Sequence, residues 1–239
     1  YKTCLVDLDL GSANIHTYLG LSPSQVGIND FLADSSLPLS HVIQSSNLPN
    51  LKVITGSSDH YESSNVSVDQ RSRLMSSLFH LKSDYVILDL SAGTHSLTLD
   101  LFLMATRHLV VYTPEPSSIE NVYRFMKAAF YQRMKRYEFQ LKLENTIELL
   151  MSHREELGIR KPADLLTWVR RKDPERGVKL SRIMEGLRFE MVMNQSRVNR
   201  DADVGYSVEN VCNRYFGVPC EHLGHVDDDN AVWRSLRRR

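Results

Sequence analysis

The chain of 239 residues lacks several features that would assign it to a class directly. It has only three cysteines, Cys4, Cys212 and Cys220, which are odd in number and form no CxxC pair. This pattern disfavours a disulfide framework or a thiolate metal site, and favours free buried thiols. No apolar run approaches the length of a membrane span, and nothing resembles a signal peptide.

The chain also lacks a net charge, because 29 lysines and arginines balance 29 aspartates and glutamates. No overall field therefore directs it to nucleic acid or to an anionic membrane. The balance hides an asymmetry. Residues 131–188 hold 14 basic against nine acidic residues, whereas the first 130 hold eight against 12.

The start of the chain carries the most specific pattern. An apolar strand is predicted over Thr3–Val6, and Asp7, Asp9 and Gly11 follow it directly. Side chains alternate along a strand, so both carboxylates share a face if the strand continues. Two carboxylates at a strand tip can hold a hydrated Mg²⁺. Taken alone, an ordinary Asp-Gly turn that closes a strand explains this motif better.

Apolar segments and helical periodicities alternate along the rest of the chain. This alternation predicts an α/β fold with a doubly wound, mostly parallel sheet, whose short strands are buried on both faces. Further strands are predicted at Leu51–Thr55, Tyr85–Leu88, Leu109–Tyr112, Phe189–Met193 and Glu221–Val226. Helices are predicted at Ile28–Ala33, Asp69–Leu81, Leu97–Ala105, Ser117–Phe130 and Val208–Phe216.

The segment 131–188 interrupts this rhythm, because it is far longer than one crossover helix requires. It is predicted to be helical throughout: Arg133–Ser152 continues the preceding helix, and Pro162–Arg171 and Pro174–Leu187 begin with proline. We interpret it as a basic helical insertion in an α/β core formed by 1–130 and 189–239. A solvated helical hairpin without a partner is the simpler alternative.

Polar residues gather where the predicted strands end, and this edge of an α/β sheet is where ligands bind. Asp89 directly follows Tyr85–Leu88, which is a Walker B pattern, in which the acid reaches Mg²⁺ directly or through water.

With these motifs in place, the chain resembles the MinD/ParA group of P-loop ATPases, and most closely the FlhG (FleN) branch. The matching stretches are DLDLGSANIHTYLGL (7–21), VITGSS (53–58), DYVILDLSAG (84–93), VVYTPEPSSIENVYRFMKA (110–128), VMNQSR (192–197) and LGHVDDDNAVWRS (223–235). The resemblance implies the P-loop NTPase type of fold, with ATP and Mg²⁺ as cofactors.

The resemblance also implies site residues. Asp7 and Asp9 are the expected catalytic residues, with Asp7 orienting the attacking water, and Asp89 and Asp9 are the expected metal ligands. The expected nucleotide-binding residues are Asn14, Gly93, Asn194 and Asp228. The loop near Asp228 departs from the family pattern, which often has proline where this chain has Asp227.

One family element does not occur in these residues. The family begins with a strand and a glycine-rich loop of the type KGGxGK followed by Ser or Thr, whose backbone N–H groups and lysines hold the phosphates. No such loop is present in the sequence. ATPase activity is therefore expected if the loop lies upstream of Tyr1.

The function implied by the resemblance is an ATP-dependent, dimerising molecular switch that acts in the placement of flagella or another polar structure. Expected partners are a second copy of the chain when ATP is bound and a protein that engages the insertion 131–188. The implied location is cytoplasmic, with peripheral membrane association through a segment outside this chain. A ParA-like DNA partition ATPase and a non-catalytic interaction module are the alternatives, and DNA is the less favoured partner.

Overall fold

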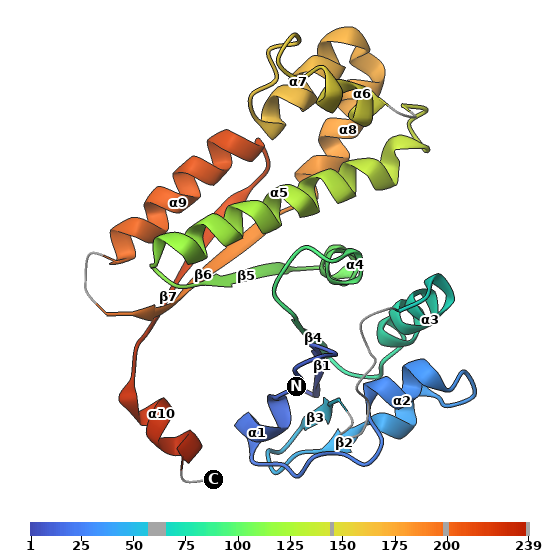
Figure 1. The fold of residues 1–239 in the computed structure, drawn as a ribbon, viewed down its shortest axis with the longest axis vertical. Helices are drawn as coiled ribbons and strands as arrows, with labels where there is room; N and C mark the ends of the chain where they lie inside the picture. The colour runs from blue at the N-terminus through green and yellow to red at the C-terminus, as the bar shows by residue number, and fades with distance from the viewer. Residues whose placement is uncertain (57–65, 144–145, 198–200, 238–239) are drawn as a thin grey trace. The chain divides into compact units, whose positions relative to one another are not determined.

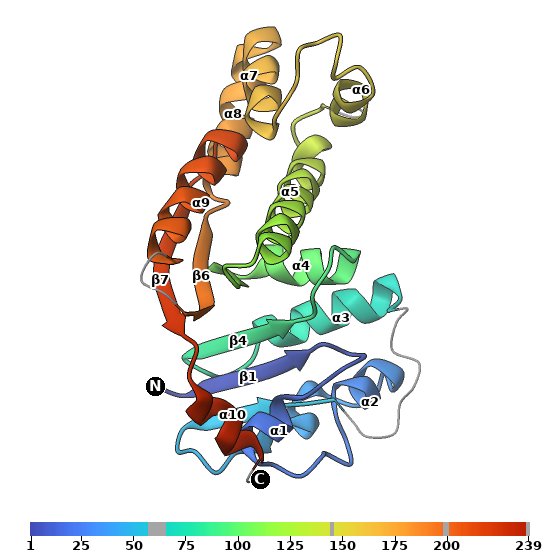
Figure 2. The same cartoon turned by 60° about the vertical axis from the view of Figure 1, so that its left-hand side comes forward.

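The computed structural model describes residues 1–56, 66–143, 146–197 and 201–237. The chain divides into two compact units, which we describe separately (Figures 1 and 2). The first unit contains Tyr1–Met104 and Asn230–Arg239, and the second contains Ala105–Asp229. Among the described residues, no helix combines the length and the apolar character needed to cross a membrane.

A four-stranded sheet with the order β2-β3-β1-β4 organises the first unit. Its strands are β1 (Thr3–Leu8), β2 (Gln44–Ser45), β3 (Leu51–Ile54) and β4 (Tyr85–Leu90). β1 is parallel to both neighbours, and only the short β2 is antiparallel. The register between β1 and β4 sets Asp7 opposite Asp89.

The helices of the first unit are α1 (Ile15–Leu19), α2 (Ile28–Ala33), α3 (Val68–Phe79), α4 (Ser96–Met104) and α10 (Asn230–Arg237), with a 3-10 turn, η1, at Leu39–Val42. One apolar cluster joins Val6 of β1 to Phe31 of α2, Leu74 of α3 and Leu101 of α4. Alternate strand residues face this cluster, so α2, α3 and α4 cover the same side of the sheet.

The second unit contains a parallel sheet with the order β5-β6-β7. Its strands are β5 (His108–Tyr112), β6 (Phe189–Ser196) and β7 (Cys220–Asp227). The long helix α5 (Pro116–Glu138) and α9 (Asp201–Phe216) lie side by side on this sheet, as Figure 1 shows. Phe216 joins the layers, because its ring centre lies 6.2 Å from that of Phe130 on α5 and 6.0 Å from that of Phe189 on β6.

The segment 131–188 is largely helical, and helices begin at Pro162 and Pro174 as predicted, but its first part differs from the prediction. The expected continuation of one helix through Arg133–Ser152 is wrong, because α5 ends at Glu138. The chain then turns through Lys142, which has a φ of 53°, and the Glu138 carbonyl accepts a bond from the Leu143 amide at 2.8 Å. The segment continues with α6 (Thr146–Ser152), α7 (Pro162–Lys172) and α8 (Pro174–Glu185).

The prediction of an α/β fold with mostly parallel strands is confirmed. The prediction that the short strands are buried on both faces is wrong for β4 and β5. Ile87 and Tyr85 of β4 are 52% and 56% exposed, and Leu109 and Val111 of β5 are 52% and 57% exposed. Within the described ranges, β4 pairs only with β1 and β5 only with β6, so each is an edge strand with an uncovered apolar face.

Candidate functional site

The carboxylate of Asp7 is buried at the end of β1, where 1% of the residue is exposed. Its Oδ2 accepts hydrogen bonds from the backbone amides of Asn14 at 2.8 Å and Ile15 at 3.0 Å. Its Oδ1 accepts a longer bond of 3.3 Å from the amide of Asp9. The amides that begin a helix have no partner within it. Asp7 supplies this partner to α1, and the loop 9–14 in turn fixes the orientation of the carboxylate.

Asp9 lies beyond the strand rather than on it. β1 ends at Leu8, and the Asp9 carbonyl accepts a bond from the Ser12 amide at 3.0 Å. The expectation that Asp7 and Asp9 share a strand face therefore fails, because the turn begins before Asp9 can take its place in the strand. Asp9 is half-buried, and Asn14 is exposed immediately before α1.

Asp89 stands on β4 next to this pair, directly opposite Asp7 in the parallel register. Asp89 is exposed as a residue, but partial burial of its carboxyl raises the pKa of that group above its usual range, and the negative charges of Asp7 and Asp9 raise it further. Three carboxylates therefore share one edge of the sheet and repel one another. A bound cation would relieve this repulsion.

Asp89 and Asp9 fit the way in which Mg²⁺ is usually bound. The described residues contain no group of three or more His, Cys, Asp or Glu side chains arranged to hold a metal ion. Mg²⁺ does not need such a cage, since it keeps several waters and takes one or two carboxylates together with substrate phosphates. Asp89 and Asp9 can provide those carboxylates at this edge of the sheet.

Two glycines shape the loops around the carboxylates. Gly93 follows β4 with a φ of 99°, a conformation that other residues rarely adopt, and it leaves its amide on an exposed loop. Gly56 follows β3, and a Cβ placed there would lie 2.7 Å from the Cβ of Ala13. Gly56 therefore lets the strand end approach the loop between Asp9 and Asn14. The sequence signal for this role of Gly56 is its position directly after the predicted strand Leu51–Thr55.

The remaining predicted site residues lie in the second unit. The amide of Asp228, just after β7, donates to the carbonyl of Ser196 at 2.8 Å, which joins the ends of β6 and β7. Its carboxylate forms an ion pair with Arg197 at 2.9 Å, a partner that sequence reasoning missed. Asn194 is half-buried near the end of β6, where its Oδ1 accepts from the Gln195 amide at 3.0 Å.

The predicted residues thus form two sets. One set lies at the carboxyl ends of the strands of the first unit and contains Asp7, Asp9, Asn14, Asp89 and Gly93. The other lies at the carboxyl ends of the strands of the second unit and contains Asn194 and Asp228. In both sets the residues lie in the last part of a parallel strand or shortly after it, at the edge where α/β sheets bind ligands.

Comparison with known proteins identifies the fold. No protein-family model and no curated protein matches the sequence. Solved structures do match over 99% of this chain. The septum site-determining protein MinD with Mg-ADP from Pyrococcus horikoshii has a TM-score of 0.60 and 16% identity, with 73% of its chain covered. A ParA family ATPase from Chlorobium tepidum has a TM-score of 0.57 and 16% identity, with 76% of its chain covered.

The MinC:MinD cell division complex of Aquifex aeolicus gives a TM-score of 0.56 at 16% identity, with 73% of that chain covered. At these identities the likeness establishes the fold. The chain has the α/β fold of the MinD and ParA proteins, and the predicted P-loop NTPase type of architecture is confirmed. The particular FlhG branch stays a prediction.

Proposed function

We propose that this protein is an ATP-dependent molecular switch of the MinD/ParA kind, whose metal and γ-phosphate lie at the strand edge of the first unit. The observation that carries the proposal is the juxtaposition of Asp7 and Asp89 on neighbouring parallel strands, with Asp9 beside them. The resemblance of the surrounding stretches to the family and the shared fold support the same assignment.

Each carboxylate has a role that follows from its position. Asp89 and Asp9 would hold Mg²⁺, which neutralises charge on the transferring phosphoryl group when bound. Asp7 is held by backbone amides and is buried, so its position is fixed. A fixed carboxylate suits the task of orienting an attacking water. Phosphoryl transfer needs such positioning and charge neutralisation more than covalent chemistry.

The other predicted residues would bind the nucleotide. The Gly93 amide would meet the terminal phosphate, Asn14 would lie beside it, and Asn194 and Asp228 would contact the base. Because Arg197 pairs with the Asp228 carboxylate, a bound base would meet this ion pair and not a free carboxylate.

The switch is proposed to act by dimerising when ATP is bound and by engaging a protein through the insertion 131–188. Arg170, Arg171 and Lys172 are exposed in the last turn of α7 and give that surface its positive charge. The resemblance to the FlhG branch supports a role in placing flagella or another polar structure.

The test is ATP binding and turnover by the full-length protein and two variants. Asp7→Asn removes the charge of Asp7 but keeps its size and one acceptor oxygen. We expect it to lower turnover by about 100-fold or more while ATP affinity changes little, because water orientation matters mainly in the transition state. Asp69→Asn, an exposed carboxylate in the first turn of α3, is the matched control.

Equal turnover by wild type and Asp7→Asn would refute the role of Asp7. Full-length protein that binds no ATP would refute the proposed function itself and favour a non-catalytic interaction module.

A further inference from the structure

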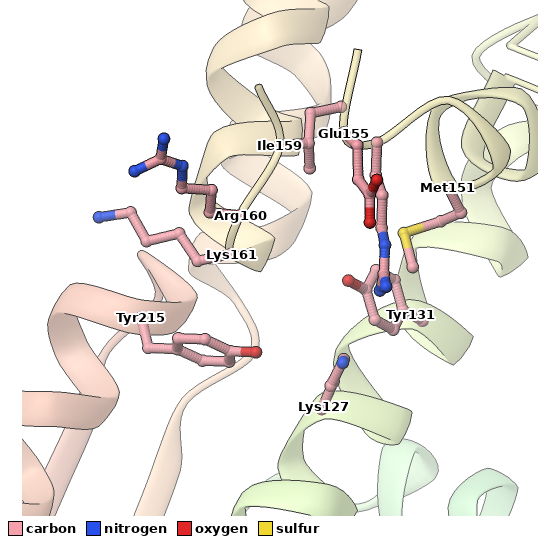
Figure 3. A pocket seen from close by; sticks show the side chains of 9 residues that line it. Lys127, Tyr131, Met151, Glu155, Ile159, Arg160, Lys161 and Tyr215 are labelled. Atoms are coloured by element: carbon pink, nitrogen blue, oxygen red, sulfur yellow. The ribbon is translucent and has the colours of Figure 1, made fainter. Parts of the chain in front are cut away.

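A cavity of about 330 Å³ opens in the second unit between α5, α9 and the connection from α6 to α7 (Figure 3). Lys127 and Tyr131 come from α5, Tyr215 comes from α9, and Arg154 and Arg160 come from the connection. This volume is at the lower end of the range for small-molecule sites.

The cavity is separate from Asn194 and Asp228. Tyr215 is near the end of α9, and the chain after α9 reaches the start of β6, where the Pro219 carbonyl accepts from the Phe189 amide at 2.9 Å. Asn194 and Asp228 lie instead near the ends of β6 and β7. The cavity therefore opens beside the opposite end of these strands.

The connection that carries Arg154 is held in place by its own backbone. The Ile159 amide donates to the Arg154 carbonyl at 2.8 Å, and Gly158 closes this turn with a φ of 68°. Ile159 is buried, and the Nζ of Lys161 donates to the Arg214 carbonyl at 3.1 Å. These contacts tie the connection to α9, so the cavity has a fixed wall on that side.

Several cations elsewhere in this unit pair with carboxylates, whereas those that line the cavity form no salt bridge among the described residues. Arg107, Arg188 and Arg197 each pair with a carboxylate. Among the described residues, no salt bridge involves Lys127, Arg154 or Arg160. Of the residues that the structure describes, Glu155 is the one carboxylate that lines the cavity, and it forms no salt bridge with any of them.

A second cavity of about 340 Å³ in the same unit provides a comparison. It is also lined by charged residues, but Asp173 pairs with Arg176 at 3.4 Å and Glu175 pairs with Lys179 at 2.7 Å. Its charges largely neutralise one another, whereas those of the first cavity do not. The lining of the first cavity holds four cations and one carboxylate, a net charge of +3, whereas that of the second holds three and two, a net charge of +1, so the first has more positive charge to offer to an anion.

Two tyrosines complete the lining. In Figure 3 the hydroxyl groups of Tyr131 and Tyr215 and the amine of Lys127 point into the same space. All three residues are half-buried, which reduces the competition of water for their donors. Burial and the neighbouring Tyr215 raise the pKa of Tyr131 against the opposing effect of Arg154, so the Tyr131 hydroxyl stays protonated and able to donate at neutral pH.

We propose that this cavity binds a small ligand through a phosphate group. A phosphate concentrates up to two charges and three acceptor oxygens on one centre, which matches ammonium, guanidinium and hydroxyl donors gathered around one small space. A single carboxylate offers half that charge. In Figure 3 the side chains of Arg160 and Lys161 point away from this space, so the assignment rests on Lys127, the two tyrosines and Arg154. The guanidinium group of Arg154 can match phosphate oxygens in pairs, and Lys127 supplies a point charge.

The test titrates inorganic pyrophosphate into the full-length protein saturated with Mg-ADP, with the heat of binding as readout. Saturation keeps the probe from the proposed nucleotide site. Lys127→Gln is the test variant. Lys135→Gln is the matched control, because Lys135 is exposed on the same helix and lies outside the cavity. We expect Lys127→Gln to weaken pyrophosphate binding about tenfold, as loss of a charged hydrogen bond does, and Lys135→Gln to leave it nearly unchanged.

Two further arms define the ligand. Malonate, a dicarboxylate of similar length, is expected to bind more weakly than pyrophosphate, and equal binding would overturn the phosphate assignment. Phosphatidylcholine vesicles that contain phosphatidic acid report a lipid source: binding that needs Lys127 supports a phosphate site filled by a headgroup. No binding of either phosphate probe, or an equal loss in the two lysine variants, would overturn the proposal. Because ATP hydrolysis is not the readout, failure here leaves the proposed switch untouched.

Discussion

Replacement of Asp7 by alanine tests whether this buried carboxylate organises the loop that follows β1. The variant leaves the Asn14 and Ile15 amides, now bonded at 2.8 and 3.0 Å, without their acceptor. Each buried donor that loses its partner costs about 1–3 kcal/mol. Two such donors give about 2–6 kcal/mol, and because Asn14 is exposed its amide can recover water. We therefore expect a loss of about 3 kcal/mol.

The assay is urea unfolding followed by circular dichroism, together with hydrogen exchange of the Asn14 and Ile15 amides. Asp7→Asn keeps one acceptor oxygen and should lose about half as much stability. Asp9→Ala is the control, because the Asp9 side chain accepts no hydrogen bond from the described residues, and its cost should stay within about 0.5 kcal/mol. Unchanged exchange at both amides in Asp7→Ala would refute the capping role.

Three further predictions follow from other contacts. The pKa of Asp89 is raised in the folded state, so the folded protein binds the Asp89 proton more tightly than the unfolded chain does. The protonated Asp89 therefore stabilises the fold below pH 3.8, and this stabilisation is lost as pH rises through the folded pKa. Asp89→Asn should therefore stabilise the protein at pH 7 and not at pH 3, and equal effects at both would contradict the assigned repulsion. Arg73 donates to the carbonyls of Asp34 at 3.2 Å and Leu37 at 3.2 Å and also bonds Phe31, so Arg73→Lys should cost about 2 kcal/mol in urea unfolding despite keeping the charge. Ile87→Lys on the uncovered face of β4 should slow aggregation, measured by light scattering, without lowering the unfolding midpoint. Unchanged aggregation would show that this face is covered in solution.

The sequence predicts elements and their order well, because each depends on local pattern. All six predicted strands lie where apolar runs place them, whereas the two-residue β2 and the helix α10 were not predicted. The helix α2 keeps its predicted bounds, Ile28–Ala33. The short helix α1 was missed, since five residues give too little periodicity and its amides are satisfied by Asp7, which lies seven residues before Asn14. A contact of this kind is set by the path of the loop and not by local propensity.

In the candidate site, too, the residues that follow local patterns could be predicted, and the contacts between distant residues could not. Asp7 and Asp89 could be identified from strand-then-acid patterns, whereas their shared register depends on which strands are neighbours in the sheet. The Arg197 partner of Asp228 and the cavity at Lys127 join residues far apart in the sequence, so no motif marks them. The exposed faces of β4 and β5 could not be predicted either, because apolar composition does not reveal which face finds a covering layer.

The most direct test of the central claim is the position of the metal. Mn²⁺ can replace Mg²⁺ and broadens the NMR signals of nearby amides. With ATP and Mn²⁺ added to the full-length protein, the account predicts selective broadening at Asp7–Gly11 and Asp89–Gly93, strong with the nucleotide and weak without it. Broadening that avoids both loops, or that is the same without ATP, would contradict the assignment of this strand edge as the Mg-ATP site.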